Sequence, residues 1–416
     1  MRLILVHNRY ISRRAGVEKR ARTVTLMDTL TLLGIIAGIY ILIYIIAQVI
    51  GPERFSERGI EAGTPFFIMF KTERLNAFLT RLGKKTPRVF FNIGILVGFG
   101  GMIFAFWMLA DNLMKFFFVP SSAGGVVPII PGVTVTGLPL IYIMIGLAIT
   151  LVTNEFAHGI ASARDDIPIR SSGLFFFLVL FGGFVEPDEE VFEKEATPQS
   201  RMRLLAAGSY VNMVFALIAM LLIANFAALM SIGFNPPSGA YIYDIDPNSP
   251  AADALQVGDV IIGLNDTEIE NWANVSQFMS HAIAGSNLTI VTLRHGSVNI
   301  TLAAHELNAT RGYIGIYGAD YWEPKPGWEW IPGGPMFAFH VRLTLMWTFM
   351  ILFSVALFNL LPIPAFDGDK LLSNALGLVM KDERRVRQIM WPLRGLAIAL
   401  ILLNIGLSLW FGKGLF

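Results

Sequence analysis

The sequence predicts a mainly α-helical membrane protein with about six transmembrane helices, a short membrane-associated β hairpin and an inserted α+β domain outside the membrane. The first observation is composition: hydrophobic residues make up 54% of the 416 residues and charged residues 15%, against about 25% charged residues in soluble domains. The second is a set of apolar runs that are each long enough to cross a bilayer. The third is one long segment in which short β-like runs alternate with turns.

Charge and cysteine content exclude several classes of protein. The chain has 32 lysines and arginines against 31 aspartates and glutamates, so its net charge is +1 and it lacks the basic excess of a nucleic-acid binder. It has no cysteine, which excludes disulfides, thiolate metal ligands and a thiol nucleophile.

The apolar runs define the helices and the domains. A bilayer core requires about 20 apolar residues of helix. The first run follows a basic stretch and has no small-residue cleavage site, so we expect a retained helix rather than a signal peptide. The six runs are residues 27–50, 89–111, 138–160, 204–231, 340–362 and 392–411. Four parts are predicted. Residues 1–88 are an N-terminal segment with the first helix and a basic loop, and residues 239–306 are the inserted domain. Residues 89–231 contain the helices of a first polar motif, Asn154 to His158, together with the hairpin, and residues 340–416 contain the helices of a second polar motif, Asn359 to Gly368.

A shorter apolar run, Leu174 to Val185, cannot span a membrane as a helix. It lies between Ser171 and the acidic stretch that begins at Glu186. We expect strands or a re-entrant hairpin covered by other helices, because lipid satisfies no backbone hydrogen bonds. An interfacial helix is the alternative.

Lysine and arginine are unevenly divided between the two sides of the membrane. Residues 51–88, 161–203 and 363–391 carry eight, five and five of them, whereas 112–137, 232–339 and the C-terminal tail carry one, three and one. The positive-inside rule therefore places the first three segments in the cytoplasm. The N-terminus, with seven basic residues, falls on the other side, and this conflict stays open. Glycosylation acceptor triplets agree in sign, since all lie in 232–339: Asn265, Asn274, Asn287, Asn299 and Asn308.

Residues 239–306 predict a small folded domain outside the membrane. Short β-like runs and turns are followed by a helix at 272–283 and by strands at 288–294 and 297–303. The string from Ser249 to Asn265 (SPAADALQVGDVIIGLN) resembles PDZ domains of the bacterial and archaeal type. The resemblance implies a groove beside an exposed strand edge, where C-terminal peptides bind. A spacer or steric filter without a ligand is the alternative.

Polar residues inside an apolar run are costly and are therefore functional candidates. The third run ends with Asn154-Glu155-Phe156-Ala157-His158, in which positions 154 and 158 share one helix face. This is the spacing of the zinc-protease motif H-E-x-x-H, in which two histidines bind zinc and the glutamate activates water. Here Asn154 replaces the first histidine. Taken alone the motif is weak, and a solvated polar helix end is the alternative.

A second polar site ends the fifth run. Asn359 is followed by Pro362 and Pro364, which break the helix, and then by Asp367. A carboxylate on such a turn can point back into the bundle and complete a metal site of two histidines, one carboxylate and a water. Both motifs lie at the predicted cytoplasmic ends of their helices, as the orientation requires. A helix-ending loop in which Asp367 caps the next element is the alternative.

Together the two motifs resemble the site-2 protease family of intramembrane zinc metalloproteases, in the archaeal type with one inserted PDZ domain. Asn359-x-x-Pro362 followed by Phe366-Asp367-Gly368 matches the second family motif, with Phe366 where leucine is usual. Further matches are Pro131-Gly132-Val133, the stretch Phe184 to Glu190, and Ala207-Gly208-Ser209 with Asn212.

The resemblance implies a protease that hydrolyses peptide bonds within transmembrane segments, in a multi-pass protein of the cell membrane. Glu155 would be the general base, Zn²⁺ the cofactor, His158 and Asp367 its ligands, and Asn359 a substrate-binding residue. The segment 174–185 would pair with an unwound substrate as a strand. The implied partners are transmembrane protein substrates, the lipid bilayer and C-terminal peptides at the PDZ groove. The PDZ domain would be extracytoplasmic and the active site near the cytoplasmic side.

Asn154 stands at the position of the missing first histidine, and its amide oxygen is a poorer zinc ligand than imidazole. Three explanations stay open: an introduced inactivating substitution, a natural pseudoprotease, or weak ligation in a slow enzyme. The alternative function is therefore a non-catalytic membrane protein that binds transmembrane or PDZ-ligand peptides. A transporter with Glu155 and Asp367 as a proton relay ranks last, because the two halves show no convincing internal repeat.

Overall fold

The computed structural model describes residues 31, 34, 35, 37–130, 134, 135, 138–177, 180–305 and 308–413. The chain divides into two compact units. Unit 2 is the continuous stretch Ala219–Met346, and unit 1 is formed by the described residues before and after it.

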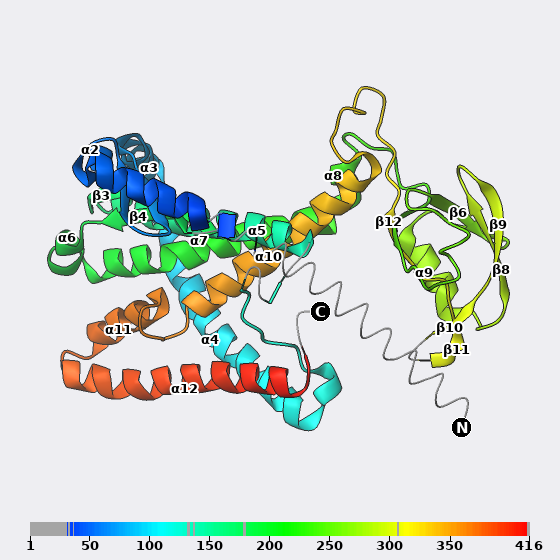
Figure 1. Cartoon of the computed structure of the whole chain (residues 1–416). Helices are drawn as coiled ribbons and strands as arrows, with labels where there is room; N and C mark the ends of the chain where they lie inside the picture. Colours follow the sequence, from blue (N-terminus) through cyan, green and yellow to red (C-terminus); the bar gives the residue numbers. More distant parts are fainter. Residues whose placement is uncertain are drawn as a thin grey trace. The chain divides into compact units, whose positions relative to one another are not determined.

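Among the described residues, five helices are long and apolar enough to cross a membrane (Figure 1). They are α4 (Arg88–Phe118), α5 (Leu138–Arg164), α7 (Pro198–Ala224), α10 (Phe337–Asn359) and α12 (Glu383–Trp410). These helices coincide with five of the six predicted runs, although the fourth run is divided, because α7 ends at Ala224 and the short helix α8 (Phe226–Met230) follows. The first run, 27–50, lies partly outside the described residues, and its part Ala37–Ile50 is an apolar helix.

The short apolar segment forms two strands rather than an interfacial helix. β3 (Ile169–Phe177) and β4 (Leu180–Pro187) pair antiparallel. β1 (Ile60–Thr64) and β2 (Phe67–Lys71) complete a four-stranded sheet in the order β1-β2-β3-β4. No strand was predicted from the sequence at β1 or β2. Both lie in the basic loop, and β2 pairs with β3, which is far away in the chain. β4 is an edge strand of this sheet, and it packs against α5.

Unit 1 is held together by close helix packing around the two motifs. α3 (Glu73–Lys85) and β4 pack on α5, whereas α12 packs on α4 and on α11 (Asp367–Val379). Glycines on α4 allow the close approach that membrane helices favour. A Cβ at Gly94 would lie 2.9 Å from the Tyr210 ring of α7. α4 and α7 therefore lie in close contact.

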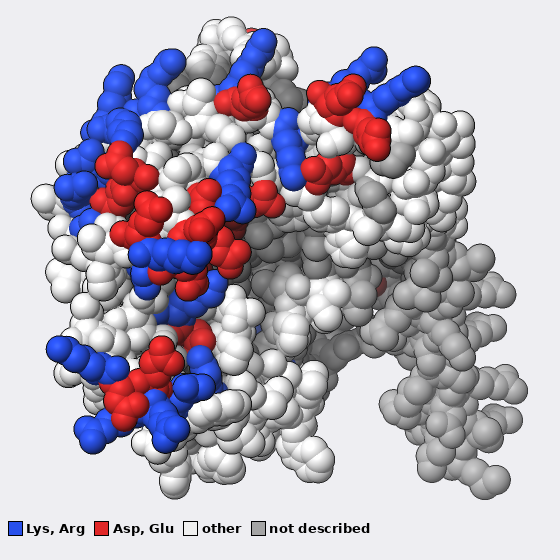
Figure 2. Space-filling model, turned by 90° about the vertical axis from the view of Figure 1, so that its left-hand side faces the viewer, with Lys and Arg blue, Asp and Glu red and all other residues white. Residues whose placement is uncertain are grey.

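Charged side chains gather at one end of unit 1, and Figure 2 views that end. It includes the short helices α2 (Pro52–Ser56), α3 and α6 (Glu189–Lys194) and the start of α12. The short 3-10 helix η1 (Pro120–Ser122) follows the end of α4. α5 ends at Arg164 and α7 begins at Pro198, so the polar motif at the end of α5 lies toward this charged end.

Unit 2 contains the inserted domain, a mixture of strands and one helix. Its main sheet is antiparallel with the order β12-β5-β6-β8-β9, and β7 pairs with β6. The elements of the domain are β5 (Ala240–Ile245), β6 (Val260–Leu264), β7 (Thr267–Glu268), α9 (Trp272–His281), β8 (Asn287–Thr292), β9 (Gly296–Thr301), the hairpin β10 (Ala303–His305) and β11 (Asn308–Tyr313), and β12 (Ile316–Asp320). The 3-10 helix η2 (Gly334–Met336) follows the domain and precedes α10. Ile242, Ile261 and Ile290 are fully buried in its core. β12 lies beyond residue 306 and pairs with β5 at the sheet edge.

Candidate metal centre and substrate cavity

Three polar side chains come from one turn near the end of α5. Asn154 and His158 lie on the same face because they are four residues apart, and Glu155 adjoins them. His158 is buried, with 8% of its surface exposed. Asn154 Nδ2 donates a hydrogen bond to Glu155 Oε1 at 3.1 Å. The amide oxygen of Asn154 is thereby left to face away from Glu155.

The ring of His158 is oriented by a backbone carbonyl of α7. Its Nδ1 lies 2.9 Å from Leu204 O. Because a carbonyl oxygen only accepts, Nδ1 carries the hydrogen and donates it. In the neutral ring the lone pair is then on Nε2, which faces the cavity side. Metal-binding histidines are oriented in this way by outer partners.

Asp367 reaches His158 from the break that follows α10. Its Oδ2 lies 3.2 Å from His158 Nε2 and accepts a 2.7 Å hydrogen bond from Asn359 Nδ2. The chain turns sharply here, with a positive φ of 81° at Ala365. Gly368 lies directly against the backbone of Leu360, where a Cβ would not fit. The proline break and this glycine together return the carboxylate to the end of α5.

Gly208 of α7 provides the space between these groups. A Cβ at this position would lie 2.5 Å from His158 Nε2 and still closer to Asn154 Oδ1. Asn154 Oδ1 is buried and has no hydrogen-bond partner among the described residues. A buried polar atom without a partner is costly, so a further group at this point would satisfy it.

The donor set can be compared with the needs of a zinc ion. Zinc binds nitrogen and oxygen ligands at about 2.0–2.2 Å in a tetrahedral arrangement, and two such ligands lie about 3.3 Å apart. The separation of 3.2 Å between His158 Nε2 and Asp367 Oδ2 agrees with this value. Among the described residues no group of three or more His, Cys, Asp or Glu side chains is arranged for a metal. His158 and Asp367 thus supply one imidazole and one carboxylate at a separation that suits zinc, and a third protein donor would have to be the unpartnered amide oxygen of Asn154.

Glu155 connects the motif to the edge of the sheet. Its Oε2 accepts a long hydrogen bond, 3.4 Å, from the backbone N–H of Val185 in β4. β4 pairs with β3 on its other side only. The carboxylate therefore lies between the candidate metal ligands and the outward-facing backbone of an edge strand.

A cavity of about 700 Å³ opens onto this arrangement. Its lining includes all five predicted site residues, namely Asn154, Glu155, His158, Asn359 and Asp367. At its rim Arg170 donates from Nε and Nη2 to Asp188, at 3.1 and 3.2 Å. These hydrogen bonds hold the pKa of the Asp188 carboxyl below its usual range, so Asp188 stays charged beside Arg170.

The contact of the Leu204 carbonyl with His158 was not predicted from the sequence. No sequence signal marks a backbone acceptor of this kind. Gly208 was noted only as part of a motif, and its contact with both Asn154 and His158 emerges from the packing of α7 on α5. Pro131-Gly132-Val133, noted in the sequence, lie outside the described residues.

Comparisons with known proteins agree with the two motifs. The model of Peptidase family M50 matches residues 142–402, which include the five site residues. An uncharacterized protein of Methanocaldococcus jannaschii is 27% identical over 262 residues, which cover 63% of this chain and 61% of that protein. A membrane-bound transcription factor site-2 protease homolog of Arabidopsis thaliana is 23% identical over 203 residues, 48% of this chain and 39% of that protein. The chain thus spans less than two thirds of the length of each.

Two further similarities were found. A candidate zinc metalloprotease of Clostridium perfringens is 25% identical over 279 residues, 55% of this chain and 80% of that protein. The PDZ domain of an SdrC-like protein from Listeria monocytogenes aligns with 20% of this chain and 87% of its own, at 21% identity and a TM-score of 0.18.

Proposed function

Because the chain belongs to Peptidase family M50, we propose that this integral membrane protein is a metalloprotease that hydrolyses peptide bonds within transmembrane segments. One observation carries the proposal. His158 Nε2, Asp367 Oδ2 and the unpartnered Asn154 Oδ1 converge beside Glu155 in a single cavity. Metal-assisted hydrolysis of a peptide bond uses a Lewis acid and a base within reach of one another. This cavity supplies donor atoms that could hold the metal and a carboxylate that could act as the base.

The metal site would be held by His158, Asp367 and Asn154. When bound, zinc supplies a Lewis acid that polarises the scissile carbonyl and lowers the pKa of a water ligand to about 7. Leu204 O would keep the His158 ring in the ligating tautomer. Asn359 would orient Asp367 through its 2.7 Å hydrogen bond, and its amide would contact the substrate backbone.

Glu155 would act as the general base. It would take a proton from the attacking water and later give a proton to the leaving amine. In the structure its carboxylate accepts from Val185 N–H only weakly, at 3.4 Å, so a substrate strand can replace that contact. Glu155 would thus be freed for chemistry as substrate binds.

The edge strand β4 would hold the substrate. A transmembrane helix bonds its own carbonyls internally, so its peptide bonds are accessible only after unwinding. Addition of the unwound stretch to a sheet edge would satisfy its backbone groups. β4 would thereby align a substrate peptide bond beside Glu155.

The inserted domain would act on the other side of the membrane. We propose a PDZ domain, extracytoplasmic by the loop charges, that admits trimmed substrates or binds their C-termini. Its edge strand β12 offers a site for strand addition. The charged end of unit 1 would lie on the cytoplasmic side of the cell membrane, in line with the positive-inside rule.

Asn154 favours a second candidate, a pseudoprotease that binds transmembrane peptides without cutting them. The Asn154 amide donates to Glu155 Oε1, whereas histidine would ligate metal at this position. Zinc per chain and cleavage of a transmembrane peptide in vesicles separate the two functions. Cleavage that a chelator abolishes and zinc restores supports the protease.

The same assays on the Asn154→His chain complete the test. If zinc binding and cleavage occur only in the Asn154→His chain, the chain with Asn154 is a pseudoprotease. Neither zinc nor cleavage in either chain would refute the peptidase proposal.

A further inference from the structure

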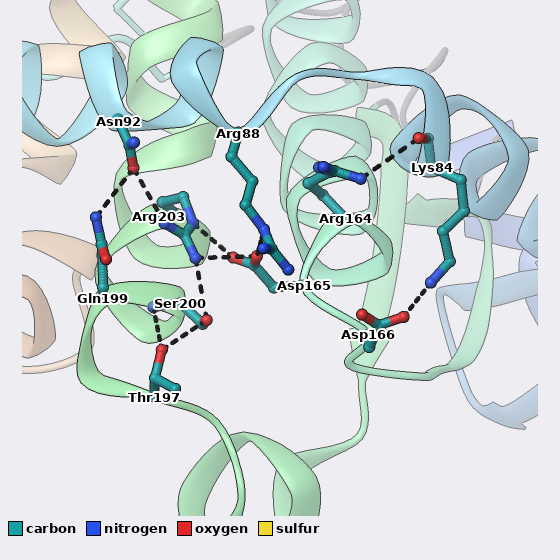
Figure 3. Close-up of polar contacts among 10 residues, drawn as sticks. All are labelled: Lys84, Arg88, Asn92, Arg164, Asp165, Asp166, Thr197, Gln199, Ser200 and Arg203. Atoms are coloured by element: carbon teal, nitrogen blue, oxygen red, sulfur yellow. Dashed lines mark hydrogen bonds and ion pairs between the residues drawn. The ribbon is translucent and has the colours of Figure 1, made fainter.

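A buried ion pair ties the end of α5 to the start of α7 (Figure 3). Arg203 Nε donates to Asp165 Oδ2 at 2.6 Å, and its Nη2 donates to Oδ1 at 2.9 Å. The side chain of Asp165 is 1% exposed and that of Arg203 is 7% exposed. Such a pair is stable only when the hydrogen bonding of both partners is satisfied.

The surrounding groups satisfy the rest of this pair. Arg203 Nη1 donates to Asn92 Oδ1 at 3.0 Å, and Nη2 also donates to Ser200 Oγ at 3.2 Å. Arg88 Nε donates to Asp165 Oδ1 at 3.1 Å. The pair is therefore a fixed point at which the first turns of α4 and α7 meet the end of α5.

The position of this fixed point relates it to the metal centre. Asp165 is the first residue after α5. It follows His158 by seven residues, about two helical turns. Arg203 immediately precedes Leu204, whose carbonyl accepts from His158 Nδ1 at 2.9 Å. Consecutive residues of α7 thus contact α5 at two points.

We propose that Arg203 and Asp165 are positioning residues for His158, because they fix the register in which Leu204 O meets the His158 ring. A backbone carbonyl carries no chemical label, so only the packing of the two helices decides which one reaches Nδ1. If α5 rotates or slides on α7, that hydrogen bond is lost and the His158 ring can turn. Nε2 would then no longer be held beside Asp367 and Asn154, where a metal ion would bind. This inference rests on the proposed function only in that His158 is proposed there as a zinc ligand.

A neighbouring ion pair is exposed, so we do not expect it to fix the register of α5 and α7. Lys84 pairs with Asp166 at the same end of α5, but their side chains are 49% and 70% exposed. Exposed pairs contribute little because water and salt screen them. The buried position of Asp165, one residue earlier, distinguishes it.

The chain also offers a matched control. Arg394 donates from Nε and Nη2 to Asp369, at 2.6 and 2.7 Å. This fork connects α12 to α11 and has the same chemistry as the Arg203 pair. It lies on the side of Asp367, which contacts His158 Nε2, and makes no described hydrogen bond to Leu204, which contacts Nδ1. Arg394→Lys therefore controls at Nδ1 for the general loss of a fork.

The test uses the full chain, selectively labelled with ¹⁵N-histidine and free of metal. The variants are Arg203→Lys, Asp165→Asn and Arg394→Lys, and His158→Gln identifies the His158 signal. Lysine keeps the charge but cannot form the planar fork. We expect the first two variants to move the ¹⁵N shift of His158 Nδ1, because the Nδ1 hydrogen loses its acceptor Leu204 O. We expect Arg394→Lys to leave the Nδ1 shift unchanged.

Zinc affinity provides a second readout. We expect a loss of about 10–100-fold in the Arg203 and Asp165 variants, as for other outer partners of metal ligands. Unchanged His158 shifts in both variants would overturn the proposal, and so would an equal change in Arg394→Lys. Unfolding of both variants while Arg394→Lys stays folded would make the pair a requirement of the fold and would also overturn it. The Nδ1 shift is measured without metal or substrate, so its outcome is independent of whether the chain cuts peptides.

Discussion

Replacement of Gly208 by alanine tests whether Asn154 and His158 converge on one ligand. The added Cβ would lie 2.5 Å from His158 Nε2, whereas ordinary contacts begin at 3.4 Å. Nε2 must then move by about 0.9 Å, the difference between these distances, and Asn154 Oδ1 must move at least as far. Metal ligands have to be held within about 0.5 Å of their working positions. We therefore expect zinc affinity to fall by about 100-fold, about 2.7 kcal/mol.

The assay is a zinc competition titration on the purified full chain, as it stands and with Asn154→His. Gly100→Ala is the control, because Gly100 is also on a long helix and a Cβ there meets nothing within 4 Å. Alanine favours helices over glycine by about 1 kcal/mol, so neither variant should unfold, which thermal denaturation checks. Equal zinc affinity in the two alanine variants would refute the reasoning that Gly208 opens the metal site.

Three further substitutions test the separate roles. Asn154→His should raise zinc affinity at least about 10-fold and increase cleavage of a transmembrane peptide, because imidazole is the better zinc ligand; unchanged affinity would remove position 154 from the site. Glu155→Gln in that background should keep the zinc and reduce cleavage by about 10²–10⁴-fold, and a variant that cuts as fast would show that Glu155 is not the base. Asp367→Ala should lower zinc per chain in elemental analysis, and full occupancy would exclude Asp367 as a ligand.

Local patterns in the sequence carried much of the candidate site. The spacing of Asn154 and His158 follows from helical periodicity, and the proline break before Asp367 follows from backbone chemistry. Both signals depend on residues that are close together in the chain. The prediction that these residues share a site came from the family resemblance, and the 3.2 Å contact between His158 and Asp367 is consistent with it.

The sheet shows the limit of such reasoning. Apolar length predicted that residues 174–185 could not span the membrane as a helix, and β3 and β4 are strands. Nothing local predicted that β2, from the basic loop, would pair with β3, or that β1 would pair with β2. Strand partners are chosen by long-range packing, which a single sequence does not display.

The sequence by itself determined the class of protein and the chemistry of its polar residues, since apolar length and helical spacing are properties of neighbouring residues. Only the tertiary structure decided how those residues are held. Leu204 O, the space at Gly208 and the fork between Arg203 and Asp165 depend on how α7 lies against α5. These contacts join residues far apart in the chain, and one of them involves a backbone carbonyl, which every residue type supplies alike.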